Sequence, residues 1–173
     1  TMKNYRRLTA PEIDILVSRM CSATDWNSIE VAEDFVPEHI QNVRFSGNVR
    51  LGVFNKEFEL AGGMRKHSGI AFATLHNVVV GDDCCIENVN YIANYEIGDG
   101  TFIENVDIIL TDGVSSFGNG VEVSVLNETG GREVMIFDKL TAQTAYVMAL
   151  YRHRPEMVGA LRGMIGRYVD EVS

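Results

Sequence analysis

A short sequence motif occurs three times between residues 80 and 123. The copies read VGDDCCIENV from residue 80, IGDGTFIENV from residue 97 and FGNGVEV from residue 117. Each copy opens with an apolar residue followed by Gly and Asp or Asn, and carries a second apolar residue six positions later. Repetition indicates a stack of similar units, because each unit needs a neighbour to cover its apolar face. We predict a parallel β-helix, in which each six-residue step supplies a short strand and a bend.

The spacing of apolar residues predicts the size of one coil. Val80, Ile86 and Ile92 fit three successive six-residue steps, and the next copy starts at Ile97, one residue early. This spacing suggests coils of about 18 residues with three sides, whose corners absorb the irregularity. The residues that we expect to point into the core are Val80, Ile86, Ile97, Ile103 and Ile109.

Helices are expected on either side of the repeat. Thr9 and Glu12 have the spacing of a capping box, and apolar residues at helical spacing follow, which predicts a helix over residues 9–22. A second helix is expected over residues 140–151, and Pro155 opens a terminal helix with an apolar stripe. The predicted organisation is an N-terminal helical lead-in (1–41), a β-helix (42–132) and C-terminal helices that cap its open end (133–173).

The six-residue period fails between residues 55 and 69, which we interpret as a loop inserted into the β-helix. This segment contains two adjacent glycines followed by Arg65, Lys66 and His67. Loops that leave a repeat tend to carry binding residues. We therefore expect the insertion to border the functional cleft, near His76 or Arg132.

Composition limits the classes of function. The net charge is −9 with a pI near 4.9, which disfavours nucleic-acid binding because that depends on many lysines and arginines. The sequence shows no signal peptide and no apolar run long enough to cross a membrane, so we expect a cytoplasmic protein. The adjacent Cys84 and Cys85 and a third cysteine lack a CxxC pattern, which favours reduced core thiols; metal or redox chemistry is the alternative.

The six-residue units resemble those of the left-handed β-helix (hexapeptide-repeat) superfamily. Val80-Gly81 with Cys84, and Ile97-Gly98 with Thr101, match its pattern of an aliphatic residue, a Gly and a small residue three positions further on. The superfamily includes acyltransferases and parts of sugar-nucleotide enzymes. The resemblance implies a left-handed β-helix, and assembly into a homo-oligomer, as a trimer.

A second resemblance covers nearly the whole chain. It is to an uncharacterised bacterial family of longer β-helix proteins with a domain of unknown function, and it is carried by residues 5–9, 45–47, 90–95, 117–123, 127–133 and 149–155. This resemblance implies a distant relation to sugar-nucleotide and acyl transferases, without an established activity. It also implies that the chain is an N-terminal part of a longer protein.

Histidines are the candidate catalytic residues, because the acyltransferases that the chain resembles use a histidine as general base. His76 precedes a repeat unit, where a side chain at a corner could face a cleft. His67 follows the glycine-rich basic segment that could fold over such a cleft. The alternative for each is a solvated histidine.

Two Gly-Gly-basic segments are candidate sites for an anionic cofactor. Paired glycines let backbone N–H groups converge on an anion, and an adjacent Arg or Lys adds positive charge. The candidate residues are Arg65 and Lys66 in the first segment, and Gly130, Gly131 and Arg132 in the second. Acetyl-CoA, a sugar phosphate or a sugar nucleotide would suit them; ordinary turns are the alternative. No metal site is predicted.

Two functions remain open from the sequence. The first is a transferase acting on a sugar nucleotide or an acyl-CoA donor, with His76 or His67 as the base. The second is a non-catalytic scaffold or oligomerisation module of a longer protein.

Overall fold

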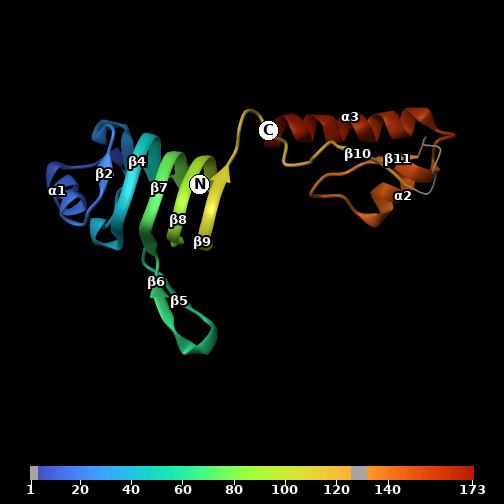
Figure 1. Cartoon of the computed structure of the whole chain (residues 1–173). Helices are drawn as coiled ribbons and strands as arrows, with labels where there is room; N and C mark the ends of the chain where they lie inside the picture. The colour runs from blue at the N-terminus through green and yellow to red at the C-terminus, as the bar shows by residue number, and fades with distance from the viewer. Residues whose placement is uncertain (1–3, 126–131) are drawn as a thin grey trace. The chain divides into compact units, whose positions relative to one another are not determined.

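The computed structural model describes residues 4–125 and 132–173 (Figure 1). The chain forms two compact units, residues 1–111 and residues 112–173. The first unit contains a large β-sheet, and the second contains two helices and a short hairpin. Each unit has its own cluster of buried apolar side chains.

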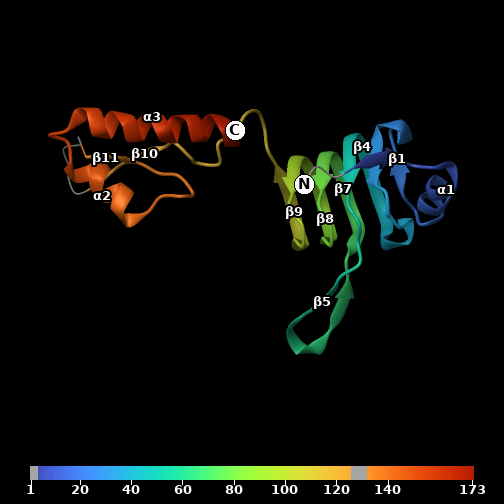
Figure 2. The same cartoon turned by 180° about the vertical axis from the view of Figure 1, so that it is seen from behind.

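In the described residues, a seven-stranded sheet forms the body of the first unit (Figures 1 and 2). Its main path follows the order β1-β3-β4-β7-β8-β9, and β2 joins it beside β4. Neighbours from β3 to β9 are parallel, whereas β1 pairs with β3 in the antiparallel direction. The strands are β1 (Tyr5–Arg7), β2 (Ser22–Ala23), β3 (Ile29–Ala32), β4 (Ile40–Leu51), β7 (Gly69–Val80), β8 (Cys85–Ile97) and β9 (Phe102–Leu110).

The prediction of a left-handed parallel β-helix is wrong. The sheet is mixed and, in the described residues, its path ends at β1 on one side and β9 on the other. Strands β4, β7 and β8 are 12 or 13 residues long. The prediction required shorter strands, each forming one side of a three-sided coil. Six is a multiple of the two-residue period of a strand, so a six-residue step also keeps apolar residues on one face of an open sheet.

The repeat nevertheless locates the core of the first unit. The first two copies lie in register on neighbouring strands, with Val80 opposite Ile97 and Ile86 opposite Ile103. The third copy belongs to the second unit, and its apolar residues Phe117 and Val123 are exposed. Val80, Ile86 and Ile97 are buried, and Ile103 and Ile109 are half-buried against the same cluster. The expected inward direction of these five residues is therefore confirmed. The three cysteines of the chain are buried and in the thiol form, namely Cys21, Cys84 and Cys85.

Helix α1 (Ala10–Ser18) confirms the expected N-terminal helix and ends earlier than predicted. The carboxylate of Glu12 accepts a hydrogen bond from the backbone N–H of Thr9 at 2.8 Å, as in a capping box, and a further one from the Thr9 hydroxyl at 2.8 Å. At the other end Met20 has a left-handed backbone (φ 66°), and the N–H of Cys21 donates to the carbonyl of Leu16 at 2.9 Å. This closing turn stops the helix.

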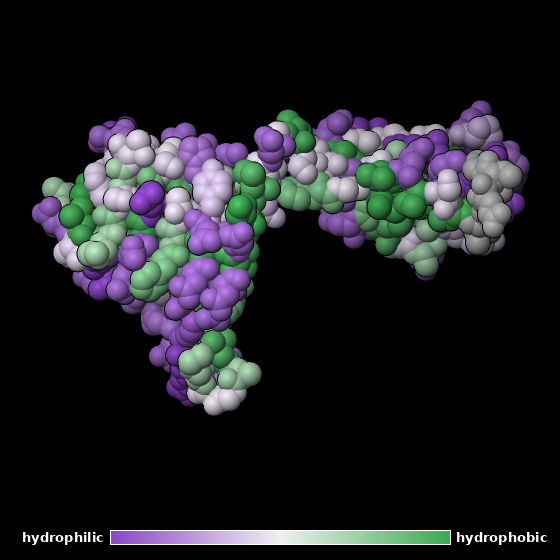
Figure 3. Space-filling view, viewed as in Figure 1, coloured by the Kyte–Doolittle hydropathy of each residue, from purple (hydrophilic) through white to green (hydrophobic). Residues whose placement is uncertain are grey.

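The insertion at residues 55–69 is an antiparallel hairpin of β5 (Glu57–Glu59) and β6 (Arg65–His67), joined through the 3-10 turn η3 (Ala61–Gly63). It leaves the sheet just before β7 (Figure 1). Its tip carries apolar side chains (Figure 3). Met64 is more than half exposed. The predicted loop is thus an ordered element that continues into β7.

The second unit confirms the two C-terminal helices, α2 (Ala142–Leu150) and α3 (Pro155–Val172). Met148, Ala149 and Ile165 from these helices bury their side chains with Val134 of β11 (Glu133–Met135), which pairs with β10 (Glu122–Ser124). Two further 3-10 turns lie in the first unit, η1 (Trp26–Ser28) and η2 (Pro37–His39). Among the described helices, none has both the length and the apolar content needed to span a lipid bilayer.

Candidate functional site

An irregular row of residues crosses the sheet where β4, β7, β8 and β9 bend. At equivalent register positions stand Asn42, Phe72, Asn88 and Asn105, all with φ between 50° and 56°. Asparagine tolerates this left-handed backbone, whereas it costs a bulky residue about 1–2 kcal/mol. Phe72 is therefore the exception in an asparagine row, and 48% of it is exposed to solvent.

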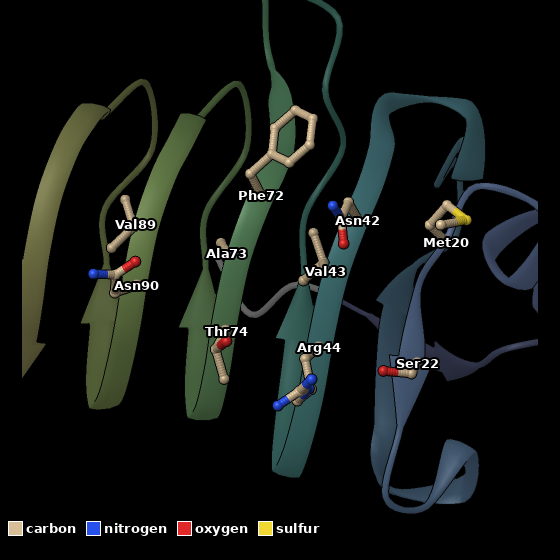
Figure 4. A pocket seen from close by; sticks show the side chains of 10 residues that line it. All are labelled: Met20, Ser22, Asn42, Val43, Arg44, Phe72, Ala73, Thr74, Val89 and Asn90. Atoms are coloured by element: carbon tan, nitrogen blue, oxygen red, sulfur yellow. The ribbon is translucent and has the colours of Figure 1, made fainter.

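Phe72 borders a groove of about 360 Å³, shown in Figure 4. We call it the Phe72 groove. Its lining residues come from the turn after α1 and from four strands: Met20, Ser22, Asn42, Val43, Arg44, Phe72, Ala73, Thr74, Val89 and Asn90. Met20, like Phe72, combines a left-handed backbone with an exposed apolar side chain. Strained backbone of this kind concentrates at functional sites.

A second row of the groove is polar. Ser22 is in register with Arg44, and Arg44 with Thr74, so these side chains lie on three neighbouring strands (Figure 4). Asn90 follows on β8, where its amide donates to the carboxylate of Asp107 at 2.6 Å. Arg44 is exposed and forms no ion pair with any residue that the structure describes. Phe72 and Arg44 lie at opposite ends of the view in Figure 4. The groove thus offers an exposed aromatic ring and a guanidinium to an extended anionic ligand that has a ring.

His76, a predicted catalytic residue, lies in a hydrogen-bond network next to these rows. The backbone N–H of Asn48 donates to the side-chain oxygen of Asn77 at 3.0 Å, which fixes the orientation of that amide. The amide nitrogen of Asn77 therefore donates to His76 Nε2 at 3.1 Å and to Asn94 at 3.2 Å. His76 Nδ1 then carries the proton and donates to the hydroxyl of Ser46 at 2.8 Å.

This network constrains the chemistry of His76. A general base needs a free lone pair, and the only lone pair of this tautomer, on Nε2, already accepts from Asn77. Ser46 is likewise the acceptor of the His76 proton, so the pair is not set up to activate the serine as a nucleophile. His76 could act as a base only after Asn77 moved.

Asn77 also lines a larger groove of about 650 Å³, which we call the Arg50 groove. It is lined by Arg7, Asn27, Ser28, Glu30, Asn48, Val49, Arg50, Asn77 and Val79. Neither this groove nor the Phe72 groove is lined by a histidine or a cysteine.

A family model described as a domain of unknown function, DUF4954, matches residues 5–173. The chain belongs to the DUF4954 family. An uncharacterised protein from Treponema pallidum (strain Nichols) is 28% identical to this DUF4954 chain over 177 residues. The alignment covers 96% of the chain and 24% of that relative, so the chain spans about a quarter of the relative's length. No solved structure matches the chain.

Arg65 and Lys66, two predicted anion-binding residues of this DUF4954 chain, lie on strand β6 of the hairpin and contact carboxylates. Lys66 donates to Glu87 at 2.5 Å and also contacts Glu104, and these two carboxylates raise the pKa of its ammonium group. Arg65 is exposed and lies 3.7 Å from Glu57. Each cation therefore already has a carboxylate partner, which argues against binding of a phosphate here.

His67, the other predicted base, stacks on His39, with ring centroids 4.2 Å apart and an interplanar angle of 15°. Its Nδ1 donates to the carbonyl of Ser68 at 2.7 Å. Burial, followed by the proximity of His67, lowers the pKa of His39. No contact joins His67 to His76 among the described residues. The expectation that they share a cleft has no support in the described contacts.

The second Gly-Gly-basic segment is only partly described. Gly130 and Gly131 lie outside the described residues. Arg132 belongs to the second unit, where its carbonyl accepts from the N–H of Val125 at 3.1 Å. Its predicted anion-binding role stays a prediction. Groups of three or more His, Cys, Asp or Glu side chains that could hold a metal ion are absent from the described part of the chain.

Sequence reasoning missed the Phe72 groove, although a signal exists. The strand segments that align in the sheet read IQNV from residue 40, IAFA from residue 70, IENV from residue 86 and IENV from residue 103. Phe72 stands where the other three segments have asparagine. Only the strand register makes this comparison evident, because the spacing between the segments is unequal.

Proposed function

We propose that residues 1–111 of this DUF4954 chain form a binding unit for a small anionic ligand that contains a ring. The ligand would occupy the Phe72 groove, with its ring against Phe72 and its anionic group on Arg44. The single observation that carries this proposal is Phe72 itself, an exposed aromatic residue held on a left-handed backbone in a row of asparagines. Such strain persists where a function outweighs its cost in stability.

The ligand classes predicted from the sequence fit this groove. A sugar nucleotide and acetyl-CoA each combine a flat base with phosphates, and stacking of a base on an aromatic ring contributes about 1–3 kcal/mol. The hydroxyls of Ser22 and Thr74 are donors and acceptors for a sugar. We therefore propose a sugar nucleotide or acetyl-CoA as the ligand.

The groove supports binding more directly than catalysis. Its lining residues include no Asp, Glu, His or Cys, which are the usual acids, bases and nucleophiles. The transferase activity suggested by the resemblance remains a proposal for the whole protein, whose relative is far longer than this chain. A scaffold role is the alternative. The homotrimer that the resemblance to hexapeptide-repeat enzymes implies is a separate proposal, which light scattering of residues 1–173 tests.

Binding titrations test the proposal. UDP-N-acetylglucosamine and acetyl-CoA would be added to the ¹⁵N-labelled chain, and chemical-shift changes are expected at Phe72, Thr74 and Arg44 with at least one probe. Phe72→Asn and Arg44→Gln should each weaken that binding about tenfold or more. Phe72→Asn is the sharper variant, because asparagine suits the backbone and should leave the fold intact. Absence of any change at the groove with both probes contradicts the proposal.

A further inference from the structure

The Arg50 groove contains a row of charged residues with an excess of positive charge. Arg7 of β1 is in register with Glu30 of β3, and Glu30 is in register with Arg50 of β4. Two guanidiniums thus flank one carboxylate across three strands, and all three residues line the groove. The net charge of this row is positive in a chain whose overall charge is −9.

Contacts with Glu30 and Tyr5 orient Arg50 and leave the two terminal nitrogens of its guanidinium available to a ligand. Its Nε donates to a carboxylate oxygen of Glu30 at 2.7 Å, and its Cζ lies 5.5 Å from the centre of the Tyr5 ring. Within the described part of the chain, no hydrogen bond is donated by its two terminal nitrogens. This pair of nitrogens is the part of arginine that binds two oxygens of one anion.

Arg7 and Asn48 add donors beside Arg50. Arg7 has an exposed side chain and forms no ion pair with the described residues. Asn48 lies two residues before Arg50 on β4, so the two side chains share a face. Asn77 contributes no free group, because its oxygen and its nitrogen are taken by Asn48, His76 and Asn94.

We infer that the Arg50 groove binds an anionic carbohydrate, with a carboxylate or phosphate group between Arg7 and Arg50 and a hydroxyl on the amide of Asn48. The groove volume of about 650 Å³ is sufficient for a sugar ring with its anionic group. Glu30 keeps Arg50 oriented through Nε and leaves the terminal nitrogens to the ligand. The site is separate from the Phe72 groove and does not depend on the function proposed there.

Titration of the ¹⁵N-labelled chain with three sugars tests this inference. Glucose 6-phosphate and glucuronate carry the two anionic groups, and glucose is the neutral control. At least one anionic sugar is expected to shift the signals of Arg7, Asn48 and Arg50, and glucose is not. A response to only one of them supports the site and identifies the anionic group as phosphate or carboxylate.

Matched variants assign the binding to this groove. Arg50→Lys keeps the positive charge and lacks the paired nitrogens, so it should weaken binding about tenfold, as should Arg7→Gln. Arg7→Gln removes an exposed side chain without an ion pair and should not disturb the fold. Arg65→Gln, in the hairpin and outside the lining of both grooves, should leave binding unchanged, and Arg44→Gln tests for binding in the other groove. The inference is overturned if neither anionic sugar causes a shift, if glucose binds equally, or if only Arg44→Gln reduces binding.

Discussion

Glu87 and Glu104 stand directly opposite each other on the parallel strands β8 and β9, and both carboxylates contact the ammonium group of Lys66. Like charges at facing positions of a sheet repel each other. Lys66 comes from the hairpin that precedes β7, so one side chain of the insertion neutralises a repulsion between two later strands. The insertion therefore contributes to the stability of the sheet.

Replacement of Lys66 by methionine should destabilise the first unit by about 1–2 kcal/mol, because it leaves two partly buried carboxylates facing each other. Urea denaturation measures this change. Glu104→Gln is the control background: there the effect of Lys66→Met should shrink, since only one carboxylate remains. Equal effects in both backgrounds would show that the repulsion is unimportant.

Gly81 and Gly98 occupy the same place in two copies of the repeat and should respond differently to alanine. A Cβ at Gly81 would lie 2.4 Å from a carboxylate oxygen and 2.7 Å from the backbone nitrogen of Asp99, whereas nothing described lies within 4 Å of a Cβ at Gly98. Gly81→Ala should cost about 1–3 kcal/mol by overpacking. Gly98→Ala should change stability by less than about 0.5 kcal/mol. Thermal unfolding of both variants makes the comparison, and a similar loss in both contradicts it.

Acid should weaken the attachment of α1. The guanidinium of Arg6, together with hydrogen bonds from Thr9, lowers the pKa of Glu12 from its ordinary value of 4.5 to about 2. A carboxylate with a lowered pKa stabilises the folded state above pH 4.5, and this contribution, about 2–3 kcal/mol, is lost as the pH falls towards 2. Chemical denaturation at pH 6 and pH 3 should show the loss. In Glu12→Gln the part of the pH dependence due to Glu12 should disappear, and an unchanged profile would contradict the assignment.

Phe72→Asn should leave the stability of the first unit unchanged or raise it by up to about 1 kcal/mol, because asparagine suits the left-handed backbone and the lost phenyl ring is half exposed. The reverse change at the equivalent position, Asn88→Phe, should cost about 1–2 kcal/mol. Differential scanning calorimetry compares the two variants. A marked loss of stability in Phe72→Asn would assign the ring to packing and remove the argument for a binding role.

The proton of His76 should reside on Nδ1. Long-range ¹H–¹⁵N NMR spectra distinguish the two ring nitrogens and should show Nδ1 protonated, as the orientation of Asn77 requires. Ser46→Ala removes the acceptor and should shift the Nδ1 signal while the sheet remains folded. Protonation of Nε2 instead would restore His76 as a candidate base for Ser46.

The sequence by itself determined which residues form the core of the first unit and where its first helix begins. Val80, Ile86 and Ile97 are apolar at regular spacing, and their burial follows from the hydrophobic effect alone. The capping pair Thr9 and Glu12 specified the start of α1 through contacts within one helical turn. Such features are local or periodic, and for that reason a single sequence is enough to predict them.

The tertiary structure decided that the sheet is open and which partners the charged residues have. A six-residue step satisfies both a coil and an open sheet, so the apolar pattern could not choose between them. Lys66 resembled an anion-binding residue until the register of β8 and β9 placed two carboxylates beside it. Phe72 became notable only when three asparagines aligned with it. Strand register brings residues 16 to 30 positions apart into one row, and this pairing depends on the whole sheet rather than on any local segment.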